Sequence, residues 1–131
     1  MEWKEIGTNA GVYVLEYQAE GYARTNCCAI RLGDGFIILS PASDVAESHI
    51  QFIEKRGPIL ALVPPHPGHT LGIRDWMNLR PNLRVYAAPG AITRIKKVCK
   101  VDVQSINELP FRDKSVTISI APGVNDAALH I

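Results

Sequence analysis

Two histidines three positions apart, His66 and His69, are the residues of this chain whose types and spacing best suit chemistry. They lie in a loop rich in Pro and Gly, directly after an apolar run over residues 59–63 that predicts a strand. Imidazole nitrogens are common zinc ligands, and a loop at a strand end is where a metal hydrolase would place them. A catalytic zinc needs three protein ligands and an open position for water. The pair therefore predicts a metal site only if a third ligand reaches it.

Three other side chains are candidates for that third ligand: Asp75, Asp126 and His130. Two imidazoles alone would bind a metal weakly and reversibly. In the alternative interpretation, His66 and His69 are loop histidines that satisfy backbone groups or water. We therefore expect no resident cofactor beyond a weakly bound zinc ion, and we assign no catalytic residue.

Size and composition indicate a single globular domain over residues 1–131. Of the 131 residues, 47% are hydrophobic and 21% are charged, as in ordinary globular proteins that bury a core. The net charge of +1 gives no overall field that would attract nucleic acid or an anionic membrane, so we expect neither as a partner. The basic residues between Arg94 and Lys100 are interpreted as a solvated helix face, with a phosphate-contacting patch as the alternative.

Cysteine usage and the N-terminus both predict a cytoplasmic protein. The first residues have neither a basic nor an apolar signal region, and no apolar run approaches the ~18 residues of a membrane span. Cys27, Cys28 and Cys99 form an odd set with one adjacent pair, which is a poor disulfide framework. We interpret them as reduced thiols, the adjacent pair being part of the core.

The apolar runs predict strands first, then alternating strands and helices, then strands again. Predicted strands cover residues 12–17, 27–32, 36–39, 59–63, 84–88, 101–103, 116–120 and 127–131, and predicted helices cover about 44–57, 71–79 and 89–97. Asp34-Gly35 predicts a hairpin turn with positive φ at both central positions. Asp44, with Glu47 three residues later, predicts the capped start of the first helix. This order indicates an α/β protein with a mixed β-sheet and flanking helices.

This succession of elements resembles the N-terminal half of the metallo-β-lactamase fold, a four-layer αββα sandwich. The resemblance covers roughly residues 12–131. It rests on the hairpin that leads into residues 40–42, the strand that leads into the histidine loop with Gly72, and residues 84–90. It is most similar to an atypical branch with Ser-Pro after the hairpin, a Pro-containing histidine loop and a Trp one helical turn later, here Trp76.

The resemblance also implies that the metal site is degraded. The family's loop reads His-x-His-x-Asp-His, with Gly three residues after the last His. Aligned on Gly72, His66 and His69 keep ligand positions, whereas Pro64 and Gly68 replace a histidine and the aspartate. Two of the four ligands therefore remain.

Two further family positions are changed as well. Ser40 stands where the loop after the hairpin normally carries Asp, and Val124 stands where a further His enters from a turn. The remaining ligands of the family belong to a C-terminal half that lies outside these residues. The apolar end at Ile131 suggests that the chain is a truncated form, in which case the missing half would supply partner ligands.

Two functions of different classes follow. In the first, which we favour, the chain is a metallo-β-lactamase-fold-like protein with an incomplete metal site. It is non-catalytic and acts by binding or self-assembly, forming a homodimer through an exposed sheet face. In the second, it is a metal-dependent hydrolase of the zinc type that uses His66 and His69 plus an unrecognised third ligand. Whether the chain is an enzyme stays open at this point.

Overall fold

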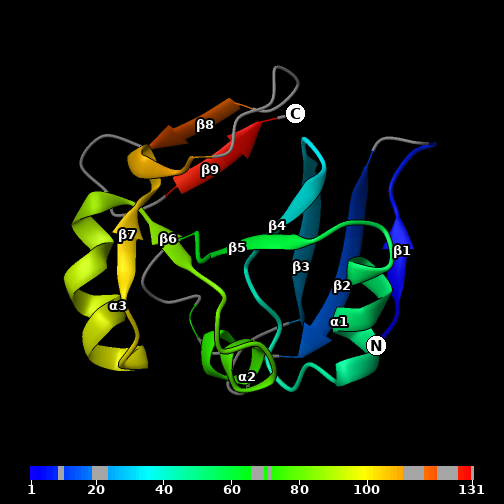
Figure 1. The fold of residues 1–131 in the computed structure, drawn as a ribbon, viewed down its shortest axis with the longest axis horizontal. Coiled ribbons are helices and arrows are strands. Elements are labelled where there is room, and N and C mark those ends of the chain that lie inside the picture. Colours follow the sequence, from blue (N-terminus) through cyan, green and yellow to red (C-terminus); the bar gives the residue numbers. More distant parts are fainter. Residues whose placement is uncertain are drawn as a thin grey trace.

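The described residues form a seven-stranded mixed sheet, three α-helices and a separate two-stranded sheet (Figure 1). The computed structural model describes residues 1–8, 11–18, 24–65, 70, 72–110, 117–120 and 127–130, the last two stretches by their backbone alone. The strands are β1 (Trp3–Glu5), β2 (Val12–Gln18), β3 (Arg24–Leu32), β4 (Gly35–Leu39), β5 (Ile59–Val63), β6 (Val85–Ala87), β7 (Val103–Ser105), β8 (Thr117–Ile120) and β9 (Ala127–His130). The helices are α1 (Glu47–Glu54), α2 (Ile73–Leu79) and α3 (Ile92–Cys99), with short 3₁₀ turns at Pro89–Ala91 and Ile106–Glu108.

The strands lie in the large sheet in the order of the sequence, from β1 to β7. The pairs from β1 to β4 are antiparallel, and the pairs from β4 to β7 are parallel. α1, α2 and α3 each connect one parallel strand to the next, and such crossovers are right-handed in nearly all proteins. Since this part of the sheet grows in one direction, three right-handed crossovers place their helices on the same face. The predicted α/β class with a mixed sheet and flanking helices is confirmed.

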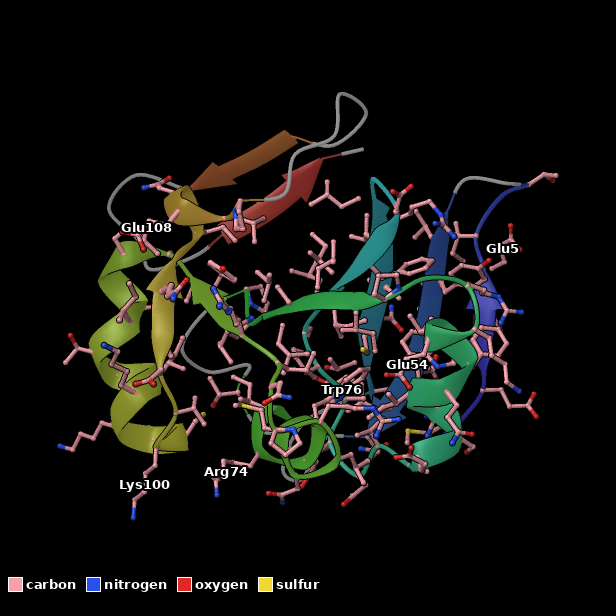
Figure 2. The ribbon with its side chains drawn as sticks, viewed as in Figure 1. Glu5, Glu54, Arg74, Trp76, Lys100 and Glu108 are labelled. Carbon is pink, nitrogen blue, oxygen red and sulfur yellow. The ribbon has the colours of Figure 1, made fainter. Side chains whose placement is uncertain are left out.

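The helix-covered face holds the larger buried cluster, which we call the helix-face cluster. It joins all three helices to one side of the strands, with Leu15, Phe36, Ile38, Ile50, Ile53, Leu62, Ile73, Trp76, Val85 and Ile95 among its members. Figure 2 shows Trp76 between α2 and the strands, where its Nε1 donates to the carbonyl oxygen of Ala42 at 3.0 Å. Because a buried indole N–H needs a partner, this bond lets a large aromatic ring lie fully inside the core.

The opposite face of the same sheet holds the second-face cluster. Its members are Ile30, Leu32, Ile37, Ala61, Val63, Tyr86, Ile106 and Leu109, each at most 4% exposed. β8 and β9 pair only with each other in an antiparallel hairpin, and in Figure 1 they lie above β6 and β7, away from α2. β4 is therefore buried on both sides, which agrees with its uninterrupted apolar sequence.

The β3–β4 hairpin is present, but its turn differs from the predicted one. Leu32 pairs with Gly35, so the two central residues are Gly33 and Asp34 rather than Asp34 and Gly35. Only Gly33 of these has a positive φ, at 65°. Gly35 is needed for another reason, since a Cβ there would lie 2.6 Å from the carbonyl oxygen of Pro58.

The start of α1 also differs from the prediction. The helix begins at Glu47 with Ala46 at its N-cap, and the Ala46 N–H donates to Nδ1 of His49 at 3.0 Å. Asp44, the predicted cap, instead lies two residues earlier in a turn with a φ of 56°. A histidine ring nitrogen therefore replaces the expected carboxylate as the local acceptor.

The sequence pattern did not predict β1, and it placed several boundaries one to three residues away from those observed. β1 has the alternating sequence Trp-Lys-Glu and becomes a strand by pairing with β2, Trp3 lying opposite Leu15. No helix in the described ranges is long and apolar enough to cross a membrane.

Candidate metal site

The candidate site lies where the neighbouring strands β4 and β5 end. The Ser40 N–H donates to the carbonyl oxygen of Val63 at 3.0 Å, so the last residues of both strands lie side by side. The loop after β4 and the loop after β5 therefore begin next to each other, as the carboxyl ends of parallel strands must. Pro64, at the start of the second loop, is buried.

Ser40 is buried, and its hydroxyl is in contact with a tyrosine. It is 5% exposed and has a φ of 55°, an uncommon conformation for a residue with a side chain. Its Oγ lies 3.2 Å from the Tyr17 hydroxyl. Burial raises the pKa of Tyr17, and the hydrogen bond to Ser40 opposes that rise in part. The position where the resemblance implies an aspartate thus holds a neutral hydroxyl in a buried pair.

Helix α2 packs tightly on the loop after β4. A Cβ at Gly72 would lie 2.1 Å from the Pro41 carbonyl oxygen and 2.5 Å from backbone atoms of Ala42, so only glycine allows this approach. The Asp44 N–H donates to Oδ2 of Asp75 at 2.8 Å. Asp75, a candidate third ligand, therefore uses one carboxylate oxygen to hold the loop against α2.

The two histidines of the motif, His66 and His69, lie outside the described residues, as do Gly68 and Asp126. His130 lies on β9 opposite Thr117, where the structure gives the backbone alone. Sequence-based assignment of these ligands therefore stays a prediction. Within the described ranges, no three His, Cys, Asp or Glu side chains come together as a metal site would require.

The flanks of the histidine loop are packed rather than open. Thr70 is 7% exposed, and its carbonyl oxygen lies 3.8 Å from Sγ of Cys99 at the end of α3. Arg74, in the first turn of α2, donates to the Cys99 carbonyl oxygen at 3.4 Å. The described strand ends beside the loop carry a proline and a paired hydroxyl, neither of which is an ordinary zinc ligand.

All three cysteines are free thiols, as predicted, and their environments suppress reactivity. Burial raises the pKa of Cys27 strongly and those of Cys28 and Cys99 as well. Since the thiolate is the nucleophile and the metal ligand, a raised pKa disfavours both roles.

Sequence reasoning missed two long-range contacts that shape this region. Tyr17 and Ser40 are 23 residues apart, and Asp44 and Asp75 are 31 apart. Neither pair has a local sequence signal. Both depend on which strand and helix the fold brings next to the loop after β4.

A groove of about 670 Å³ lies elsewhere, at the β1 end of the large sheet. We call it the N-terminal groove, and it is lined by Met1, Glu2, Lys4, Ile6, Val14, Glu16, Tyr17, Gln18, Arg24 and Asn26. None of these residues is a predicted metal ligand, although Tyr17 also pairs with Ser40 at the candidate site.

The chain matches no family model and no curated protein by sequence. It is similar in structure to the metallo-β-lactamase DIM-1, with a TM-score of 0.70 at 16% identity, over 98% of this chain and 64% of that one. The mono-zinc form of the metallo-β-lactamase FIM-1 from Pseudomonas aeruginosa gives a TM-score of 0.65 at 15% identity, with the same coverage. A flavo di-iron protein variant from Thermotoga maritima gives 0.66 at 10% identity, over 98% of this chain and 39% of that one.

At these identities the similarity concerns the fold alone. This chain spans less than two thirds of the length of the lactamases, so the matched region is only part of their fold. The seven-stranded mixed sheet with three helices on one face lies within that region. The chain therefore has a partial metallo-β-lactamase fold.

Proposed function

We propose that this chain is a metallo-β-lactamase-fold module with a degenerate metal site, and that it acts by self-association rather than by catalysis. The observation that carries the proposal is the packing at the ends of β4 and β5. Pro64 is buried, and the Ser40 hydroxyl is paired with Tyr17 inside the protein. Both positions thus support packing, whereas the resemblance implies ligands there.

Ligand counting supports the same conclusion. A hydrolytic zinc needs three protein ligands, and the motif offers His66 and His69. Asp75 already accepts a backbone hydrogen bond from Asp44 on Oδ2, so only its Oδ1 could bind a metal without releasing that N–H. Asp126 and His130 are the other candidates.

Self-association is supported by the second face of the sheet. In the full sandwich, as the resemblance implies, this face packs against a second sheet. In the described residues the second-face cluster is buried, but Val12, Cys28, Leu39 and Leu60 around it are only partly buried. A second copy placed on this face would complete the cover, giving a homodimer.

The competing function is a metal-dependent hydrolase of the zinc type, using His66, His69 and a third ligand. The similarity in fold to metallo-β-lactamases favours it. If zinc bound, it would polarise a water molecule, and the two imidazoles would hold the ion.

The two functions separate by metal content and mass. The protein is purified without added metal, and zinc, iron and manganese are measured by mass spectrometry. We expect less than about 0.1 equivalent of metal, because two imidazoles bind too weakly to retain an ion. Sedimentation at micromolar concentration should give a dimer. A stoichiometric metal that disappears in the double variant His66→Ala/His69→Ala would overturn the proposal in favour of the hydrolase. A monomer would overturn self-association.

A further inference from the structure

We propose that self-association takes place at the N-terminal groove, and that the occupant of the groove is a second copy of this chain. The inference rests on the self-association proposed above and goes further, because it names the surface and its contacts. The evidence is the position of the groove, its exposed apolar side chains and its balance of charges.

Most of the N-terminal groove lies on the second face of the large sheet, and of its lining residues Tyr17 belongs to the helix-face cluster. Lys4 is paired with Val14, and Val14 with Cys28, so their side chains form one row across β1, β2 and β3. Cys28 packs against the second-face cluster, which fixes the side on which this row points. Glu16 and Asn26 form the next row. The groove therefore continues the apolar second face toward β1, where polar residues replace the aliphatic ones.

Exposed apolar side chains gather in this groove. Among the described residues, three large hydrophobic side chains are exposed by half or more: Met1 at 50%, Ile6 at 51% and Val98 at 60%. Met1 and Ile6 both line the groove. Val98 lies on α3, which Figure 1 places at the opposite end of the sheet from β1. Two exposed large side chains beside one hollow mark an interaction surface better than scattered ones do.

The charges of the groove indicate which partner fits. Glu2 and Glu16 are balanced by Lys4 and Arg24, so the side-chain charges of the groove sum to zero although each part is locally charged. A polyanion or polycation would meet repulsion from half of these groups. A second copy presents the same two signs and can match them reciprocally, as the two halves of a two-fold interface do.

The strand register gives a specific pairing. Trp3 lies opposite Leu15 in the β1–β2 pair, so Glu2 lies opposite Glu16. On the second face, this row is next to the row that contains Lys4. Consider a two-fold axis that is parallel to the sheet, perpendicular to the strands and midway between these two rows. Rotation about this axis places Lys4 of each copy opposite Glu2 of the other. Within the described ranges Lys4 and Glu2 form no ion pair, whereas Arg24 already binds Glu16 at 2.9 Å. The Lys4–Glu2 contact is therefore the one that dimerisation would add twice.

A stable dimer needs more surface than the ten residues of the groove provide. A standard interface buries about 800 Å² on each partner, contributed by roughly 20–30 residues. The chain has 7317 Å² of accessible surface, so such an interface would take roughly a ninth of it. The ten residues of the groove would form the central part, and neighbouring second-face residues such as Val12 would form the remainder.

Charge reversal tests the pairing. We would measure the dimer dissociation constant by sedimentation equilibrium for Lys4→Glu, Glu2→Lys and the double swap. Each single reversal should weaken dimerisation by roughly 100-fold, because like charges then face each other at two places. The double swap restores opposite charges and should recover most of the affinity. A mixture of the two single variants should form heterodimers in preference to either homodimer.

A matched pair of apolar variants tests the surface. Ile6→Asp should weaken the dimer, whereas Val98→Asp, at a similarly exposed site on α3, should leave its dissociation constant unchanged. Circular dichroism would establish that each variant is folded. A wild-type dimer that none of the groove variants weakens overturns this inference alone. A wild-type monomer at micromolar concentration overturns both it and the proposed self-association.

Discussion

The two faces of the large sheet are closed in different ways. On the helix-covered face, three crossover helices fold back onto the strands to which they are joined, and the helix-face cluster reaches from β1 to β7. On the second face the cluster covers β3–β6 and the 3₁₀ turn after β7, and toward β1 it gives way to the N-terminal groove. The helix-covered face is closed by helices that directly follow its strands in the sequence, whereas the described residues cover the second face only in part around Val12, Cys28, Leu39 and Leu60. The difference explains why we place assembly on the second face.

The largest effect is expected from the helix-covered face. Trp76→Ala removes a fully buried ring and leaves the Ala42 carbonyl oxygen without its 3.0 Å partner. The loss of unfolding free energy should be about 3–5 kcal/mol, measured by urea denaturation. Trp76→Phe, which keeps most of the volume, is the control and should cost clearly less. Equal losses for the two variants would mean that the hydrogen bond, and not the packing, anchors α2.

A second pair compares the faces directly. Ile37 and Ile38 are neighbours on β4, both fully buried, and they point into the second-face and helix-face clusters respectively. Each change to Ala should cost about 2–5 kcal/mol, since each leaves a cavity in a closed core. Denaturation at two protein concentrations would measure the loss of unfolding free energy for each of the two variants. A cost below about 1 kcal/mol for Ile37→Ala would contradict the burial of the second face.

A smaller effect is expected where α2 meets the loop after β4. Gly72→Ala would push a Cβ against the backbone of Pro41 and Ala42, which cannot rotate away, and should cost about 1–3 kcal/mol. Gly33→Ala is the control, since it meets no atom within 4 Å and is strained only by its φ of 65°. Its cost should be about 1–2 kcal/mol from backbone strain alone. A thermal shift for Gly33→Ala that exceeds the shift for Gly72→Ala would show that the loop can move away from α2.

The smallest effect concerns the surface of the helical layer. Arg80 binds Glu54 at 2.8 Å and also Glu47, tying the end of α2 to α1. The hydrogen bond from Arg80 lowers the pKa of Glu47 below its ordinary 4.5. A carboxylate with a lowered folded-state pKa stabilises the protein above its unfolded pKa, and the contribution is lost as the pH falls through the folded-state value.

Arg80→Gln should therefore lower stability slightly at neutral pH and make stability less dependent on pH below 4.5. Urea midpoints across this range, at low and high salt, provide the measurement. Lys55→Gln at the end of α1 serves as the control, because within the described ranges Lys55 has no carboxylate partner. A pH profile that is identical for the wild type and Arg80→Gln would mean that the exposed pairs contribute nothing.

Strong apolar patterns in the sequence were sufficient for much of the fold. The limits of β5, Ile59–Val63, were predicted at both ends, and the uninterrupted apolar run of β4 indicated a strand buried on both sides. The secondary-structure prediction failed where the local sequence pattern was weak or was compatible with two local structures. The sequence predicted Asp44 as the cap of α1, but the helix begins after Ala46, whose N–H donates to the ring nitrogen of His49.

For the candidate site, too, some features could be predicted from the sequence and others only from the tertiary structure. The amino-acid types gave the two histidines, and the resemblance to the family implied a missing carboxylate and a proline at a ligand position, because ligand identity is a property of single positions. Only the tertiary structure decided that Ser40 meets Tyr17, that Asp75 holds Asp44, and that a short polar segment becomes the edge strand β1 beside a groove. Those outcomes depend on the pairing of segments that are far apart in the chain, and no local pattern encodes which distant partner a polar side chain will meet.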